Sequence, residues 1–258
     1  MNEITRGMLF AGAVFVGMLV LLEVGWRLRV RHHATLGAAA GEGLGAIEGA
    51  VFGLMGLLTA FTFSGAASRF DDRRALIVEE VNAIGTAYQR LDLLPPGPRA
   101  RLQQQLRDYV DARLAIYRHV PDSARVAAAV ARVIDLQGAI WQDAVAAVEA
   151  APVPTLAGQL LPAINEMFDY STRRLAATRI HPPAIIYGLL GVVSLLCALL
   201  AGYAMGGTES RPWLHSVTLA AVLAITLYVI VDLEHPRLGL FQIAEFDQLL
   251  VDLRSSMR

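Results

Sequence analysis

The residue most able to act on ions is Glu48, because it is the one charged residue in an apolar stretch long enough to cross a membrane, residues 43–67. A carboxylate near the centre of a membrane helix costs about 2.5 kcal/mol or more to insert, so it must meet a partner or water. Glu48 is therefore interpreted either as part of an ion-attracting ring near a pore mouth or as a carboxylate paired in helix packing. Arg29 and Arg31 are the candidate partners.

The same stretch carries two opposed stripes of side chains at helical spacing. The large apolar stripe consists of Leu54, Leu57, Leu58 and Phe61. In an oligomeric pore these side chains would form an apolar constriction that gates by excluding water, and they suit lipid-facing or core positions equally well. The small residues on the other stripe predict close contact with another protein helix: they are Gly45, Gly49, Gly53, Gly56, Ala60 and Ser64.

Two further sets of oxygen-bearing side chains lie outside the apolar stretches. Glu79 and Asn82 share one helical face, and Glu166 and Asp169 share another. Carboxylate and amide oxygens on adjacent helices form a possible cation site, because divalent cations prefer oxygen ligands. Salt bridges between the two helices are the alternative interpretation.

Charged residues also close the last apolar stretch, in the motif DLEHPRLG. Asp232, Glu234 and Arg237 could bind ions there, or they could pair with basic residues such as Arg69 and Arg73 at the end of the second apolar stretch. The second interpretation predicts a lock between two helices, with Asp232 held by an arginine.

The elements that must position these residues are membrane helices. The chain has 258 residues, of which 55% are hydrophobic, and its mean hydropathy is +0.48, which is typical of an integral membrane protein. About 20 apolar residues cross a bilayer. Four stretches meet this requirement: residues 8–26, 43–67, 184–205 and 213–231. Near the end of the first, Glu23 is expected to pair with Arg27 or to reach the interface.

The segment between the second and third spans predicts a helical soluble domain. No helix breaker separates the second span from the charged sequence that follows it, so one helix is expected to continue to Pro95. Further helices are expected over residues 98–119, 123–150 and 155–180, and the tail, residues 241–257, has the apolar spacing of an amphipathic helix. The predicted fold is an all-α, four-span membrane protein with a helical domain inserted between spans two and three. The predicted divisions are 1–67 and 182–232 for the spans, 68–181 for the helical domain and 233–258 for the tail.

Several functional classes are excluded by composition and motifs. The net charge of −1, with signs interspersed, argues against nucleic-acid binding. The motifs of metalloproteases, hydrolases and nucleotide-binding proteins are absent, so neither an enzyme nor a cofactor is expected. The single cysteine, Cys197, lies in an apolar run and suits packing in a membrane helix.

The arginine distribution predicts the orientation. Eight arginines near span ends lie on the side of the helical domain and four on the other side. Because arginine is enriched on the cytoplasmic side, the helical domain and both termini are expected in the cytoplasm, with the spans in a bacterial inner membrane. The basic cluster from Arg27 to Arg31 opposes this orientation.

Three stretches carry a family resemblance: GLMGLLTAFTFSGAASRFDDRRALIVEEVNAIGTAYQRLDLL, LLPAINEMFDYSTRRLAATRIHPP and YVIVDLEHPRLG. Together they resemble the bacterial DUF4239 family, often called bestrophin-like, which is distantly similar to bestrophin channels. The resemblance implies a pentamer around an axial pore with an apolar neck from the second span, and inorganic ions and membrane lipid as partners. The acidic run of a calcium clasp is missing from this sequence. The predicted function is an oligomeric ion channel, and the alternative is a non-conducting membrane scaffold or sensor that binds a partner.

Overall fold

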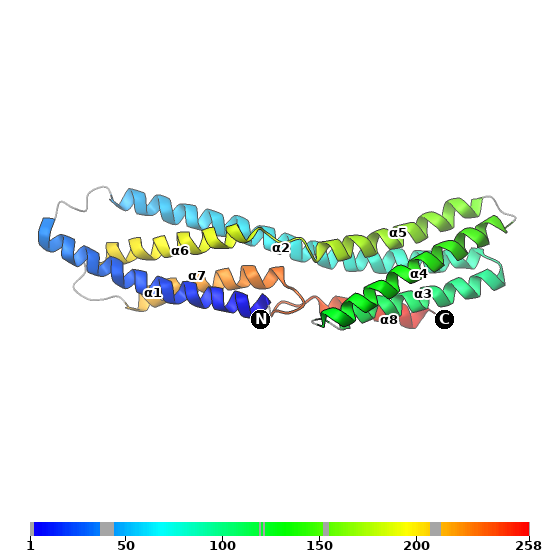
Figure 1. Ribbon diagram of the computed structural model, residues 1–258. Helices are drawn as coiled ribbons and strands as arrows, with labels where there is room; N and C mark the ends of the chain where they lie inside the picture. The colour runs from blue at the N-terminus through cyan, green and yellow to red at the C-terminus, as the bar shows by residue number, and fades with distance from the viewer. Residues whose placement is uncertain are drawn as a thin grey trace. The chain divides into compact units, whose positions relative to one another are not determined.

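The computed structural model describes residues 3–36, 44–118, 120, 122–151, 155–206 and 213–257, and every regular element within them is helical (Figure 1). This confirms the all-α prediction. Four helices, α1, α2, α6 and α7, are long and apolar enough to cross a membrane. The α-helices are α1 (Glu3–Leu36), α2 (Leu44–Arg90), α3 (Pro96–Arg118), α4 (Ser123–Glu149), α5 (Thr155–Ala177), α6 (Ala184–Met205), α7 (Trp213–Glu234) and α8 (Gln248–Ser256).

The chain divides into two compact units. The membrane unit comprises Met1–Phe70 and His181–Phe241, and the second unit comprises Asp71–Ile180 and Gln242–Arg258. Helix α2 contributes its apolar half to the membrane unit and its charged half to the second unit, as one continuous helix. The sequence predicts this continuity, because no proline separates the two halves.

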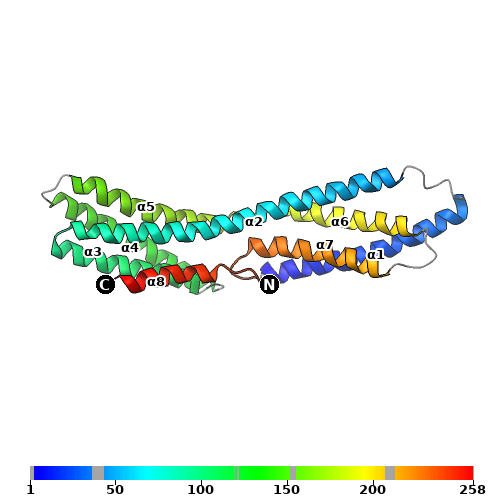
Figure 2. The same cartoon turned by 180° about the vertical axis from the view of Figure 1, so that it is seen from behind.

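In the membrane unit, α1 packs along both α6 and α7 (Figures 1 and 2). Its apolar stripe, which includes Met18 and Leu22, is buried. The approach of α1 to α6 depends on Gly25 and Gly202, because a Cβ at either position would overlap a backbone carbonyl of the facing helix. Small residues let membrane helices approach this closely. The close backbone contact between α1 and α6 therefore depends on these two glycines.

Helix α2 touches the membrane unit much less. Only 6% of its most apolar window is buried within the chain, compared with 28% in α1 and α7 and 33% in α6. Two of its residues are buried in this unit: Met55 packs against Val193 and Cys197 of α6, and Ala66 lies in the core that includes Met18 and Leu22. The four glycines of the predicted small-residue stripe make no close contact with the described residues, since a Cβ would meet nothing within 4 Å at Gly45, Gly49, Gly53 and Gly56.

The second unit surrounds an apolar core built from the charged half of α2 and from α3, α4, α5 and α8. Ile84, Leu106, Ile140 and Ile164 are fully buried in it. These helices form where apolar residues recur at helical spacing. Asp122 is the N-cap of α4, and its Oδ1 accepts hydrogen bonds from two first-turn amides. This N-cap satisfies donors that have no partner within the helix.

The short C-terminal helix α8 docks on α3 in the same unit. Leu250 is fully buried, and Arg254 donates two hydrogen bonds of 3.0 Å to the carboxylate of Asp111. A two-point guanidinium–carboxylate contact fixes orientation as well as distance. The docking therefore aligns the end of the chain with α3.

Candidate functional site

The first candidate site is the open face of α2 in the membrane unit. Leu54, Leu57 and Phe61 expose 49%, 52% and 68% of their surface within the isolated chain. Leu58 differs, because it is half-buried and packs against the core of its own chain. Three of the four predicted neck side chains thus share an open apolar face, and the fourth helps to hold α2 in place.

Glu48 lies on the same helix, near its start, and is half-buried. It forms no ion pair or hydrogen bond with any residue that the structure describes. Arg29, one of its candidate partners, lies over the ring of Tyr203 at 5.2 Å instead. Of the two interpretations of Glu48, the paired carboxylate is therefore not seen among the residues that the structure describes.

A second cluster fixes the end of α7 to α2 in the membrane unit. Glu234 is fully buried, and its Oε1 accepts from Arg69 Nε at 2.8 Å and lies 2.6 Å from a terminal guanidinium nitrogen of Arg69. Its Oε2 lies 3.5 Å from Nδ1 of His181, whose ring stacks on that of His235 at 5.1 Å. The contacts join α2, α7 and the segment that leads into α6 around one buried carboxylate.

Asp232 has a role other than the predicted arginine pairing. Its Oδ1 accepts from the Tyr228 hydroxyl and from the Leu240 amide, both at 3.0 Å, and its Oδ2 accepts from the Phe241 amide at 2.9 Å. A Cβ at Gly239 would overlap this carboxylate. Asp232 is 2% exposed. Its carboxylate is satisfied by three local hydrogen-bond donors, and it therefore anchors the turn that follows α7.

The remaining residues of the predicted lock are also placed differently. Arg73 belongs to the second unit, where it donates to the carbonyls of Ala177 and Ile180 at 3.2 and 2.9 Å. Arg237 is half-buried in the turn after α7. Of the predicted lock, the structure brings together Arg69 and Glu234.

The second unit contains a buried charge cluster that the sequence analysis did not identify. Glu80 of α2 is fully buried, and its two oxygens accept from Arg113 Nε of α3 and from a terminal nitrogen of Arg174 of α5, each at 2.6 Å. Arg174 also donates to Asp247 at 2.5 Å, and the ring of Tyr117 lies 3.9 Å from its guanidinium. Two carboxylates and two guanidiniums thus balance their charges inside the core.

The electrostatics of this cluster follow from burial and pairing. Burial alone would raise the pKa of Glu80, but the adjacent Arg113 and Arg174 outweigh it and hold the pKa below its ordinary value. The Arg113 pKa is raised despite burial, since Tyr117 and Glu80 favour its charged form. The signal in the sequence was available: Glu80 falls on the same helical stripe as the buried Ile77 and Ile84.

The structure does not bring the four residues of the predicted cation site together. Glu79, Asn82, Glu166 and Asp169 are all exposed. Within the described ranges, no group of three or more His, Cys, Asp or Glu side chains is placed to hold a metal ion. Asp169 instead accepts a 3.4 Å hydrogen bond from Asn165, one turn away on the same helix.

Comparisons with known proteins add the family. A model of the bestrophin-like domain matches residues 8–245. A comparison with curated proteins finds no match. Two crystal structures of a bacterial bestrophin homolog from Klebsiella pneumoniae have the same fold. One, with a tryptophan-to-alanine substitution, gives a TM-score of 0.71 at 13% identity over 99% of this chain and 100% of that one. The other, with a tyrosine-to-alanine substitution, gives 0.68 at 15% identity over 93% and 98%.

The match covers all four candidate membrane helices and the helices between the second and third of them. The narrower DUF4239 assignment stays a prediction, because the matching model has the broader name. The chain belongs to the bestrophin-like family.

Proposed function

We propose that the protein is an oligomeric ion channel of the bacterial inner membrane whose pore is lined by α2. The observation that carries the proposal is the 6% burial of the α2 span, together with the exposure of Leu57 and Phe61. A helix that contacts its own chain so little is available for contact with other copies and with a water-filled pathway. The bestrophin fold supports the same arrangement.

The faces of α2 suit a ring of subunits. One face carries Met55 and Ala66 and packs on its own chain. Successive residues of an α-helix are about 100° apart, so the glycine stripe lies about 120° to one side of this face and the Leu54 and Phe61 side chains about 120° to the other. Small residues on one copy can receive large residues of the next, and such a contact between unlike faces closes into a ring. The pentamer implied by the resemblance is the ring that we favour.

In this ring, the glycine stripe and the surface with Leu54 and Phe61 contact the two neighbouring subunits. The face of α2 between them points to the axis, and Leu57 lies on that face. A ring of Leu57 side chains, flanked by Phe61 at the edge of this face, excludes water from a narrow neck and makes ion entry costly. Glu48 lies two helical turns before Met55 and therefore on the opposite side of α2 from Leu57. Its carboxylate enters the proposal as a negative charge near the pore mouth, which attracts cations. Truncating the neck is therefore expected to ease wetting, and neutralising Glu48 is expected to weaken a preference for cations.

Ion flux into liposomes that contain the purified protein tests this proposal. Leu57→Ala and Phe61→Ala, singly and together, are expected to raise flux above wild type, and Glu48→Gln to reduce the ratio of cation to anion flux. Leu189→Ala is the matched control, because Leu189 is 48% exposed on α6, outside the proposed pore. Folded oligomers of wild type and the double variant that pass no ions above empty liposomes would exclude the channel and leave the scaffold as the better function.

The orientation is part of the proposal, with both termini and the second unit in the cytoplasm. Cysteines at Gln104 and at Ser210, on a Cys197→Ala background, distinguish the two sides in intact cells. An impermeant thiol reagent is expected to label the cysteine at 210 and not the one at 104. The reverse pattern would place the helical domain outside.

A further inference from the structure

One face of α1 is exposed along most of its apolar span. Leu9, Val16, Val20 and Val24 expose 57%, 58%, 54% and 38% of their surface. They are spaced four or seven residues apart, so they lie one above another on a single side of the helix. The opposite side, which includes Met18, is buried in the core of the membrane unit. We call the four exposed residues the open stripe of α1.

Two arginines continue the open stripe beyond its apolar residues. Arg27 follows Val24 by three residues and Arg31 follows Arg27 by four, and both arginines are exposed. The predicted span ends at Trp26, and tryptophan at the end of a span marks the level of the lipid headgroups. Helix α1 continues without a break to Leu36. The two guanidiniums therefore extend from a rigid helix at the edge of the apolar part of the membrane.

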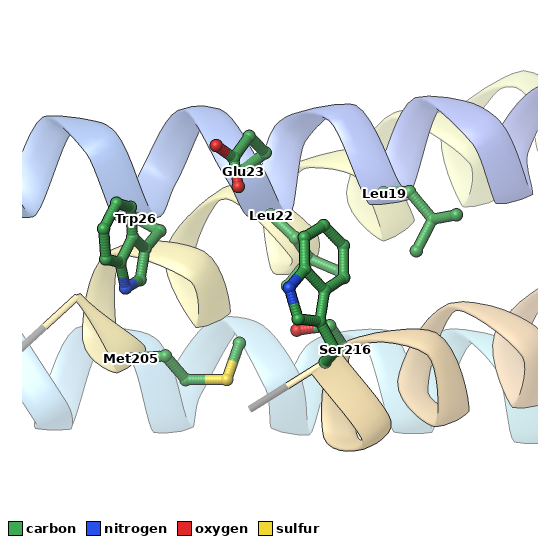
Figure 3. A pocket seen from close by; sticks show the side chains of 7 residues that line it. Leu19, Leu22, Glu23, Trp26, Met205 and Ser216 are labelled. Atoms are coloured by element: carbon green, nitrogen blue, oxygen red, sulfur yellow. The ribbon is translucent and has the colours of Figure 1, made fainter. Parts of the chain in front are cut away.

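Arg27 is oriented by a carboxylate one turn before it. Its Nε donates a 2.7 Å hydrogen bond to Oε1 of Glu23, whose side chain is 22% exposed, while 64% of the Arg27 side chain is exposed. Figure 3 shows Glu23 and Trp26 on α1 at a small cavity that Met205 and Ser216 also line. A guanidinium has five N–H donors. The contact with Glu23 uses Nε, so the two terminal nitrogens of Arg27 can donate to a further acceptor.

The basic residues on the other side of the helix end contact α6. Arg29 lies about 160° from Arg27 around the helix, and its guanidinium is 5.2 Å from the ring centre of Tyr203. Nδ1 of His32 is 3.2 Å from the Tyr203 hydroxyl. A Cβ at Gly206 would overlap the Arg29 side chain. These contacts fix the end of α1 on α6 and leave Arg27 and Arg31 on the open side.

The chemistry of the open stripe matches a phospholipid. Residues four apart on a helix are neighbours on its surface, and arginine binds phosphate through paired, charge-assisted hydrogen bonds. Val16 and Val24 are about 12 Å apart along the helix axis, which fits one leaflet, about half of a hydrocarbon core of roughly 30 Å. Glu23, Arg27 and Arg31 together carry one net positive charge. A headgroup with a net negative charge complements them better than a zwitterionic headgroup does.

We propose that the open stripe of α1 binds an anionic phospholipid of the phosphatidylglycerol type. The phosphate accepts hydrogen bonds from Arg27 and Arg31, and an acyl chain lies along Val16, Val20 and Val24. This role gives a reason for the basic residues that oppose the predicted orientation, because headgroups are present on both sides of the membrane. The assignment rests on α1 and does not depend on whether α2 lines a pore.

Lipid binding to delipidated, full-length protein in detergent tests the assignment. The measurement is the apparent affinity from the shift in the thermal unfolding midpoint as lipid is added. Phosphatidylglycerol is expected to bind about 3- to 10-fold more tightly than phosphatidylcholine with the same acyl chains. Glycerol phosphate, which has the phosphate and no acyl chain, is expected to give no shift at these concentrations. An equal shift with glycerol phosphate would overturn the assignment to a lipid, and equal affinity for the two lipids would overturn the selection by charge.

Variants separate this site from general lipid solvation. Arg27→Gln and Arg31→Gln are each expected to weaken phosphatidylglycerol binding by about 3- to 10-fold and to leave phosphatidylcholine binding nearly unchanged. Arg31→Lys keeps the charge and is expected to lose less than Arg31→Gln.

Arg101→Gln is the matched control, because Arg101 is also exposed, at 68%, and pairs with a carboxylate, Asp143, in the second unit. The unfolding midpoints without lipid show whether each variant folds like wild type. Phosphatidylglycerol affinity that is unchanged in both Arg27→Gln and Arg31→Gln would overturn the proposal. That result is expected if a second copy of the chain covers the open stripe instead.

Discussion

Removal of Glu80 tests the energetics of the second unit most directly. Its carboxylate is fully buried between Arg113 and Arg174, which are 2% and 4% exposed. Glu80→Ala leaves two buried guanidiniums with Asp247 as the remaining carboxylate of the cluster. Breaking a buried ion pair by removing one partner costs about 3–5 kcal/mol. We expect a loss of that size in the free energy of unfolding, because the orphaned cations keep their desolvation cost.

The neighbouring residue supplies the control. Glu79 is the same residue type on the same helix and is exposed, so Glu79→Ala is expected to change stability by less than about 0.5 kcal/mol. Denaturant unfolding in detergent, followed by circular dichroism, measures both variants under one condition. Equal stability of the two variants would refute the inference that the Glu80 pairs stabilise the unit.

The pH dependence of the same variants gives a second measurement. The folded-state pKa of Glu80 is lowered, so its contribution is fully present above the unfolded-state pKa of about 4.3 and is lost as the pH falls through the folded-state pKa. Wild type is therefore expected to lose more stability than Glu80→Gln on acidification below about pH 4. Parallel pH profiles would contradict the lowered pKa. The double variant Glu80→Ala with Arg113→Ala is expected to lose less than the sum of the single losses, because one orphaned cation is removed with its partner.

Three further predictions concern the membrane unit. Gly202→Ala is expected to destabilise the packing of α1 on α6 by about 1–3 kcal/mol through overpacking, whereas Gly188→Ala on the same helix, where a Cβ would meet nothing within 4 Å, is expected to leave the unfolding midpoint of the detergent-solubilised protein nearly unchanged; equal effects would contradict the close contact. Asp232→Ala is expected to loosen the turn after α7, seen as faster proteolysis there, and unchanged cleavage would remove the anchoring role. Charge reversal in Glu234→Arg is expected to be strongly destabilising and to be partly rescued by Arg69→Glu, and a double variant no more stable than the single one would contradict the pairing.

The membrane helices could be predicted from the sequence because their signal is local. Length and hydropathy are enough to recognise α6, whose observed bounds, Ala184–Met205, are those predicted. Continuity of α2 was also predictable, since only an internal proline or glycine pair would have interrupted it. Membrane spans follow from composition because every backbone group in lipid must be bonded within its own helix.

The partners of charged side chains could not be predicted in the same way. Asp232 and Glu234 are two residues apart with similar chemistry, yet one binds backbone amides and the other binds Arg69. The difference depends on the turn at Gly239, whose geometry no hydrophobic periodicity encodes. Glu80 was overlooked for the opposite reason: its position on a core stripe was visible, but the usual expectation of a solvent-exposed glutamate obscured it.

The two glycine patterns show most clearly where sequence reasoning ends. Gly53 lies in a regular small-residue stripe, and a Cβ there would meet nothing within 4 Å among the described residues. Gly25 and Gly202 belong to less regular patterns and form the backbone contact of α1 with α6. Periodicity identifies a face that can accept another helix, but it does not say whether that helix belongs to the same chain. The open glycine face of α2 also means that the α2 span is weakly held within its own chain. Between its start and the Arg69 pair, the described residues of the span that are buried are Met55 and Ala66, so a movement of this span would break few apolar contacts of the membrane unit. A helix held in this way can be displaced by small differences in contact energy, as a gate at the proposed neck requires.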